Sequence, residues 1–323
     1  MNSIWERPNL ISIIILVIIL AVGTGYVLFT LQQRPETESF TVDDDYYFPY
    51  NFDRLDRVVK LPGELDEISG LCRGFRPDEV FAVQDEEGIM FRVNTVSGQL
   101  LQEITFGKDL DYEGLTRKDR QFYALEADGD IHTFSYTQDT LTEVESNKLE
   151  TSFSYRNDTE GICYDSITNT LLIVPKAQEL NPQGDNETRR GIYTYDLLEN
   201  RLNNQPTYFI DGLVVGQIIF GKNREYVIKP SGIAVEPATG YIFVISAVGN
   251  ILVVIDRDSQ VKHVELLEQN VFRQPEGITF GPNGELYISS EGRGGHGMIA
   301  TLTRNAQITN DNGSRGEGDR REN

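Results

Sequence analysis

Short apolar runs recur along residues 51–304, and most are rich in β-branched or aromatic side chains. They have strand length, and turn-forming segments such as DSITN, EPATG and GPNG separate many of them. No stretch in this region shows the long period of an amphipathic helix. The pattern therefore predicts an all-β domain. The clearest runs are VFAVQ, FYALE, LLIVP, YIFVIS and LYISS.

A repeat organises these strands. Five segments carry Glu or Ser, then Gly, then Leu or Ile, and the successive glycines are 44, 47, 71 and 45 residues apart. The long interval holds a polar insertion at 181–190 and a further loop near 211–228. Units of about 45 residues with a turn signal about every 10 residues are typical of propeller blades. The sequence predicts a five-bladed β-propeller over residues 51–304, with a six-bladed ring as the alternative. The repeats are DEISGLC from Asp66, LDYEGLT from Leu110, NDTEGIC from Asn157, IKPSGIA from Ile228 and RQPEGIT from Arg273.

The ends of the ring predict how it closes. The fifth unit ends near Arg304 with three strands, while residues 56–62 (DRVVKLP) form a strand pattern that precedes the first repeat. Pairing this strand into the last blade would remove an exposed edge. Cys72 and Cys163 occupy the same position in the innermost strands of blades one and three, too far apart for a disulfide. We expect two buried free thiols.

An apolar segment precedes the repeats. Residues 9–31 contain no charged side chain over 23 positions, which is long enough to cross a bilayer. We expect a single-pass signal anchor after a short tail at 1–8, with a cleaved signal peptide as the rival interpretation. Residues 32–50 read as a tether and 305–323 as a disordered polar tail. The propeller is then expected in the periplasm or outside the cell, held at the cell (inner) membrane by this helix.

The charge limits the partners. The formal net charge of −21 would repel phosphate backbones, so nucleic acid is not an expected partner. Such a chain attracts divalent cations and basic partners.

Carboxylates recur at one position of the repeat. Glu113, Glu160 and Glu276 each precede a repeat glycine, where Ser69 and Ser231 stand in the other two repeats. The second strand of each blade should return to the same end of the ring. Two like charges about 4 Å apart repel by about 4 kcal/mol at an effective dielectric near 20. Ca²⁺, a shared proton or the ammonium of a lysine could offset this, or the glutamates could simply cap strand ends. The residues after the second strands include Asp85, Glu126, Lys176, Ser246 and Glu291.

The order of these motifs resembles a known family. EISGL, DYEGL, FYALEADGDI, TEGICYD, LLIVPKA, PSGIAVEPATG and QPEGITFGPNGELYISSEG are similar to the SdiA-regulated, YjiK-like bacterial proteins over residues 50–304. The resemblance implies a five-bladed propeller distantly related to NHL-repeat proteins, an N-terminal membrane anchor and a bound calcium ion. The calcium ligands that it implies are Glu113, Glu160, Glu276 and Glu126.

Two functions follow as hypotheses. The first is a non-enzymatic calcium-binding propeller that serves as an interaction module or scaffold, with another envelope protein as partner. It is favoured because the sequence shows no close histidine pair or Ser-His constellation. The alternative is a divalent-metal-dependent hydrolase of a lactone, ester or phosphoester, with the carboxylates at the channel mouth binding the metal and Asp85 or Glu126 as base.

Overall fold

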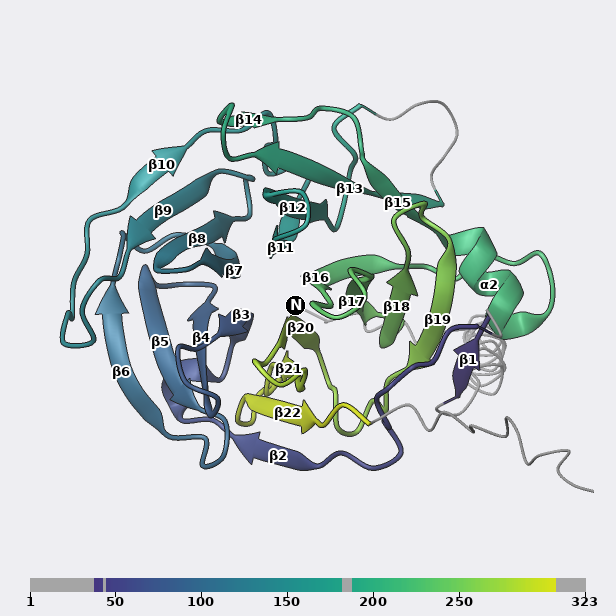
Figure 1. The fold of residues 1–323 in the computed structure, drawn as a ribbon, viewed down its shortest axis with the longest axis horizontal. Coiled ribbons are helices and arrows are strands. Elements are labelled where there is room, and N and C mark those ends of the chain that lie inside the picture. Colours follow the sequence, from purple (N-terminus) through teal and green to yellow (C-terminus); the bar gives the residue numbers. More distant parts are fainter. Residues whose placement is uncertain (1–37, 43–44, 182–187, 306–323) are drawn as a thin grey trace, which may run out of the picture. The chain divides into compact units, whose positions relative to one another are not determined.

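The computed structural model describes residues 38–42, 45–181 and 188–305, in which five sheets surround a common axis (Figure 1). Each sheet is one blade, and its main strands follow one another in chain order from the axis outward. The predicted five-bladed β-propeller is confirmed, and the six-bladed alternative is wrong.

The blades contain the following strands. Blade one holds β3 (Ile68–Arg73), β4 (Glu79–Gln84), β5 (Ile89–Asn94) and β6 (Leu100–Thr105). Blade two holds β7 (Tyr112–Lys118), β8 (Gln121–Glu126), β9 (Ile131–Ser135) and β10 (Asn147–Leu149). Blade three holds β11 (Thr159–Asp165), β12 (Thr170–Pro175), β13 (Arg189–Asp196), β14 (Arg201–Leu202) and β15 (Tyr208–Asp211). Blade four holds β16 (Lys229–Val235), β17 (Ile242–Val248), β18 (Ile251–Ile255), β19 (Val261–Leu266) and β1 (Ser39–Thr41). Blade five holds β20 (Pro275–Phe280), β21 (Leu286–Ser290), β22 (Met298–Leu302) and β2 (Arg57–Lys60).

The core consists of five apolar clusters, one between each pair of neighbouring blades. The middle strands are buried on both faces, which is why their sequences are continuous apolar runs rather than alternating ones. In β12, for example, Leu172 and Val174 face blade four, while Leu171 and Ile173 face blade two. Neighbouring blades thus hold each other through both faces of every sheet.

The repeat glycines stand where the innermost strands approach one another most closely. A Cβ built on Gly70 would lie 2.5 Å from Cα of Gly114, and one on Gly277 would lie 2.7 Å from the carbonyl oxygen of Ser69. Every innermost strand also has a register irregularity at its repeat glycine. Glycine is needed here because a side chain would collide with the neighbouring backbone.

The ring closes as predicted from residues 56–62. β2 pairs antiparallel with β22, with Arg57 opposite Thr301 and Lys60 opposite Met298. Val59 is buried against blades one and five, whereas Val58 faces outward. The start of the domain thereby supplies the outer strand of its last blade (Figure 1).

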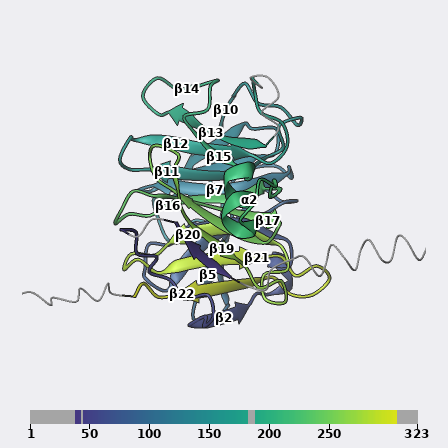
Figure 2. The same cartoon turned by 90° about the vertical axis from the view of Figure 1, so that its right-hand side faces the viewer.

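Two segments differ from expectation. The described residues 39–42 and 45–50 do not form a simple tether, because β1 adds to the edge of β19 and Tyr46 and Tyr50 are buried in the core between blades four and five. Part of the segment expected as a loop near 211–228 is the helix α2 (Gly212–Phe220), which lies on the rim beside β19 (Figures 1 and 2). Asp211 caps its first turn, and Gly221 ends it with a φ of 63°.

The predicted anchor at 9–31 and nearly all of the tail at 305–323 lie outside the described residues. Within the described ranges, no helix combines the length and apolarity needed to span a bilayer. The two cysteines, in contrast, can be assessed: both are buried and free, as predicted.

Candidate cation site at the axial mouth

Three glutamates from different blades line one small cavity on the axis. Glu113 of β7, Glu160 of β11 and Glu276 of β20 surround a volume of about 10 Å³ together with Ser231 and the repeat glycines. Such a volume holds about one water-sized body. The structure therefore brings together three of the four carboxylates that were predicted as ligands, at what we call the acidic mouth.

Their environment opposes negative charge. Burial raises the pKa of Glu113 to about 10, and the charges of Glu160, Asp111 and Glu276 add to this rise. Burial, followed by the charges of Glu160 and Glu291, also raises the pKa of Glu276 well above its ordinary value. The site thus needs a proton or a cation to offset its charge.

One carboxylate oxygen of Glu276 is buried without a partner. The residue is 4% exposed, and Oε2 has no hydrogen-bond partner among the described residues. A buried acceptor without a partner costs about 1–3 kcal/mol. This orphan atom indicates that a ligand or a proton completes the cavity.

Lys176 supplies one protein cation. It follows β12, and its ammonium forms an ion pair with Oε1 of Glu160. Burial raises the pKa of Glu160 to about 7 although Lys176 lowers it. Among the residues that the structure describes, Lys176 is the one basic side chain that acts strongly on these glutamates.

A second group of carboxylates lies around the same mouth. Burial, and then the charges of Asp85 and Glu67, raise the pKa of Glu291 to about 7. Burial and Glu67 likewise raise the pKa of Asp85, whose buried Oδ1 has no hydrogen-bond partner within the described part of the chain. Ser246, predicted for the same face, instead bonds to backbone carbonyls of its own blade.

Sequence reasoning missed three acidic residues of this mouth: Glu67, Asp111 and Asp158. Each stands two positions before the Glu or Ser of its repeat. All three directly precede an innermost strand, and this constant offset from the repeat position was the signal that could have identified them.

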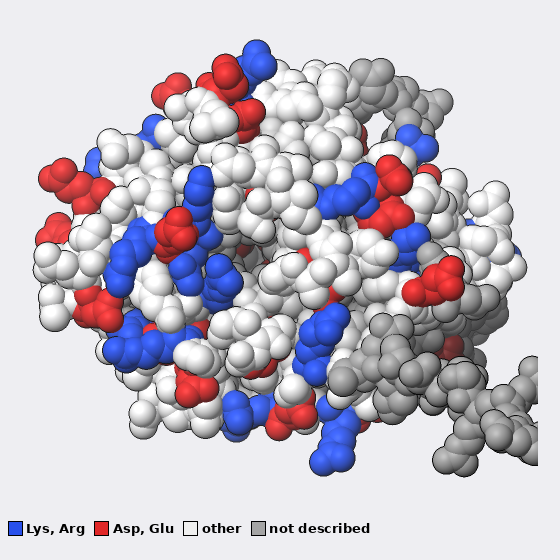
Figure 3. Space-filling view, in the orientation of Figure 1, with Lys and Arg blue, Asp and Glu red and all other residues white. Residues whose placement is uncertain are grey.

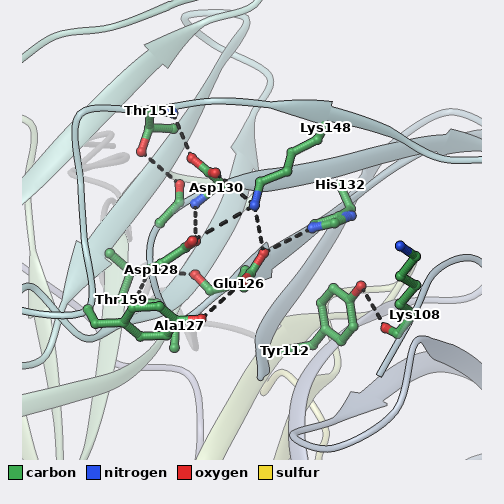
Figure 4. A network of polar contacts seen from close by, with 12 residues as sticks. Lys108, Tyr112, Glu126, Ala127, Asp128, Asp130, His132, Lys148, Thr151 and Thr159 are labelled. Carbon is green, nitrogen blue, oxygen red and sulfur yellow. Dashed lines mark hydrogen bonds and ion pairs between the residues drawn. The ribbon is translucent and has the colours of Figure 1, made fainter. Parts of the chain in front are cut away.

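Glu126 is not brought to the cavity. It lies at the end of β8, and its carboxylate is held by Lys148 and His132 at 3.2 and 3.1 Å (Figure 4). Tyr155 donates a third hydrogen bond to it at 3.3 Å. Lys148 also bonds to Asp130 at 2.9 Å. Because its carboxylate oxygens are engaged in this network, Glu126 does not join the three axial glutamates at the cavity.

The chemistry of the cavity fits a hard cation in part. Ca²⁺ takes about six to eight oxygens in a loose shell, and Glu113, Glu160 and Glu276 line the same cavity with carboxylate side chains. Across the described ranges, however, no three His, Cys, Asp or Glu side chains are grouped closely enough to form a ready metal site. Binding would therefore require these side chains to move inward and Lys176 to release Glu160.

Five radial sheets around an axis, with buried glutamates at one mouth, define this chain as a five-bladed β-propeller with an acidic axial site. The chain belongs to the SdiA-regulated family, whose family model matches residues 54–293. The resemblance stated from the sequence motifs is thus confirmed.

Solved structures share the fold at low sequence identity. The glutaminyl cyclase of Myxococcus xanthus is 14% identical, with a TM-score of 0.51 and coverage of 78% of this chain and 96% of that one. The PQQ-bound aldose sugar dehydrogenase of Streptomyces coelicolor is also 14% identical, with a TM-score of 0.50 and coverage of 77% and 97%. No curated protein matches the sequence significantly.

Proposed function

We propose that this protein is a calcium-binding β-propeller that serves as an interaction module, with its ion at the acidic mouth. The observation that carries the proposal is the orphan Oε2 of Glu276, buried in a cavity shared with Glu113 and Glu160. An ion held there would join blades two, three and five near the axis. Its contribution would be to stabilise the ring.

A melting experiment tests the calcium proposal. At a free Ca²⁺ concentration of 100 times Kd, binding stabilises the folded state by about 2.7 kcal/mol. For a domain of this size we expect Tm to rise by roughly 5–10 °C between chelator and Ca²⁺. Glu276→Gln should remove most of this rise in Tm, because it replaces one carboxylate oxygen with an amide nitrogen and removes the negative charge of the side chain.

The matched control is Glu103→Gln, which makes the same chemical change at an exposed position of β6. It should respond to Ca²⁺ as the wild type does. A wild-type Tm that is indifferent to Ca²⁺, or a Glu276→Gln protein with the full response, would contradict the assignment.

The location is also part of the proposal. We propose that residues 9–31 anchor the chain in the cell membrane and that the propeller faces the periplasm or the outside, where it meets an envelope partner. The uncharged 23-residue segment supports this. Full-length chain in the membrane fraction, with the propeller open to protease added from outside the cytoplasm, is the expected result. A chain that fractionates as soluble protein would refute the anchor.

Asp85 favours a second candidate, a metal-dependent hydrolase. Its unpartnered Oδ1 and raised pKa suit a general base beside the axial site. A bound divalent ion would polarise a carbonyl or phosphoryl oxygen of the substrate. An assay of lactone and phosphate-ester hydrolysis in the presence of Ca²⁺ tests this candidate. Hydrolysis by the wild type that is abolished in Asp85→Asn would support the hydrolase, provided that Ca²⁺ still raises the Tm of the variant.

A further inference from the structure

A larger cavity lies at the opposite ends of the innermost strands. Its volume is about 150 Å³, and its lining includes Arg73 at the end of β3 and Arg117 near the end of β7. We call this opening the basic mouth. Five apolar side chains, one from each innermost strand, line both cavities and separate them: Leu71, Leu115, Ile162, Ile233 and Ile278.

The guanidinium of Arg117 is held in place by uncharged groups, so its positive charge is not neutralised. Its guanidinium donates three hydrogen bonds to backbone carbonyls, from Nε to Arg73 at 2.7 Å and from the two terminal nitrogens to Gly74 and Asp119 at 2.6 Å each. It also stacks on the ring of Phe75, 4.7 Å from the centroid. Because a guanidinium has about five N–H donors, two remain available to a ligand.

The surroundings leave this positive charge largely uncompensated. Burial lowers the pKa of Arg117, and the charges of Arg73 and Arg120 add to that effect while Asp119 opposes it. Arg73 is exposed and has no hydrogen-bonded carboxylate within the described ranges. On the face shown in Figure 3, Lys and Arg side chains gather over blades one and two beside the central hollow, although the whole chain is strongly acidic.

Two carboxylates at this mouth, those of Glu236 and Asp165, are already engaged. Glu236, which lines the cavity, accepts hydrogen bonds from Tyr50, Thr239 and Arg304. Asp165, at the end of β11, is paired with Arg257. Neither acid therefore supplies a free partner for Arg73 or Arg117.

We propose that the basic mouth binds a small organic anion, with one carboxylate or phosphate group on the arginines and an apolar body on the five-residue partition. A cavity of about 150 Å³ accommodates a body about the size of benzene. The carbonyl bonds of Arg117 fix its guanidinium before the ligand arrives, which lowers the ordering cost of binding. The partition keeps such an anion away from the carboxylates of the acidic mouth.

Calorimetric titration of the full chain with benzoate and phenyl phosphate tests the proposal, with benzyl alcohol as the neutral analogue. Saturable binding of at least one anion is expected, at least tenfold tighter than benzyl alcohol. Arg73→Gln and Arg117→Gln should each weaken it tenfold or more. Arg54→Gln, an exposed arginine that does not line the cavity, should bind as the wild type does.

The choice of variants separates loss of binding from loss of folding. Arg117→Gln loses bonds to the backbone and can fail to fold, whereas the exposed Arg73 makes no side-chain hydrogen bond among the described contacts, so Arg73→Gln should fold. Glu103→Gln, at an exposed position that lines neither cavity, should leave anion binding unchanged. Absence of saturable binding for both anions, equal affinity for benzyl alcohol, or full affinity in Arg73→Gln would overturn the proposal.

Discussion

The ammonium of Lys176 forms an ion pair with Oε1 of Glu160, which places a protein cation at the edge of the cavity where we propose that Ca²⁺ binds. The lysine and the ion would therefore compete for the same carboxylate. Lys176 is 31% exposed at its side chain, so it can withdraw toward solvent. If Ca²⁺ binds as we propose, the Lys176–Glu160 ion pair would lower its affinity for the acidic mouth.

The first prediction concerns Lys176→Met. Without Ca²⁺ the variant should be less stable than the wild type by about 1–3 kcal/mol, because the buried carboxylate of Glu160 loses its partner. With Ca²⁺ the variant should gain more than the wild type does, because no ammonium has to be displaced. Paired melts in chelator and in Ca²⁺ measure both effects. Equal gains for the two proteins would show that Lys176 does not compete with the ion.

The second prediction tests the packing of the innermost strands. Gly70→Ala should destabilise the fold by at least about 1–3 kcal/mol, because the new Cβ would meet Cα of Gly114 and the backbone nitrogen of Leu115 at 2.5 Å. Gly63→Ala is the control, since its Cβ would meet nothing closer than 4.0 Å. Denaturant unfolding gives the two free energies. Similar stability of the two variants would contradict the close approach at the axis.

The third prediction tests the closing strand with two adjacent residues. Val59→Asp should destabilise the domain by about 3–5 kcal/mol, because it buries an unpaired charge between blades one and five. Val58→Asp introduces the same group at a residue that is 48% exposed, and it should change the stability little. If both variants unfold alike, β2 is not seated on β22 with the register described.

The fourth prediction concerns pH. Burial lowers the pKa of His263, although Glu265 opposes this effect. The unfolded chain then takes up a proton at this residue near its ordinary pKa of about 6.5, while the folded chain does so only at lower pH. The stability that the neutral imidazole provides is therefore present above about pH 6.5 and is lost as pH falls below it.

His263→Gln isolates this contribution. Glutamine keeps hydrogen-bonding groups for Thr41 and Glu265 but cannot titrate. The free energy of unfolding of the wild type should fall more steeply than that of the variant between pH 7 and pH 5.5. Parallel curves in chemical denaturation would refute the role of His263.

The sequence was most informative where geometry forces a residue type. The glycines at 70, 114, 161, 232 and 277 could be recognised because backbones meet at the axis, and the free strand at 56–62 could be placed because the last unit was short. The helix at 212–220 was missed because GLVVGQIIF is almost uniformly apolar and shows no helical stripe. Its caps, Asp211 and Gly221, were local signals that the overall pattern did not reveal.

The candidate site was predictable to the same extent. Glu113, Glu160 and Glu276 occupy equivalent positions of the repeat, so the symmetry of the ring brings them together. Glu126 follows the repeat as well, but Lys148 on the outer strand β10 engages its carboxylate (Figure 4). The register of β10 depends on the irregular segment before it, from 136 to 146, and no repeat position in the sequence specifies that register.

The pairing of β2 with β22 also has a consequence for biosynthesis. The two strands lie about 240 residues apart along the chain, so β2 is synthesised long before β22 and cannot pair until that strand emerges from the ribosome. Until then blade five has no outer strand, and two unpaired edges are open to other nascent chains. Substitutions in β22 should therefore reduce the yield of folded protein in the cell more than their effect on equilibrium stability alone would suggest.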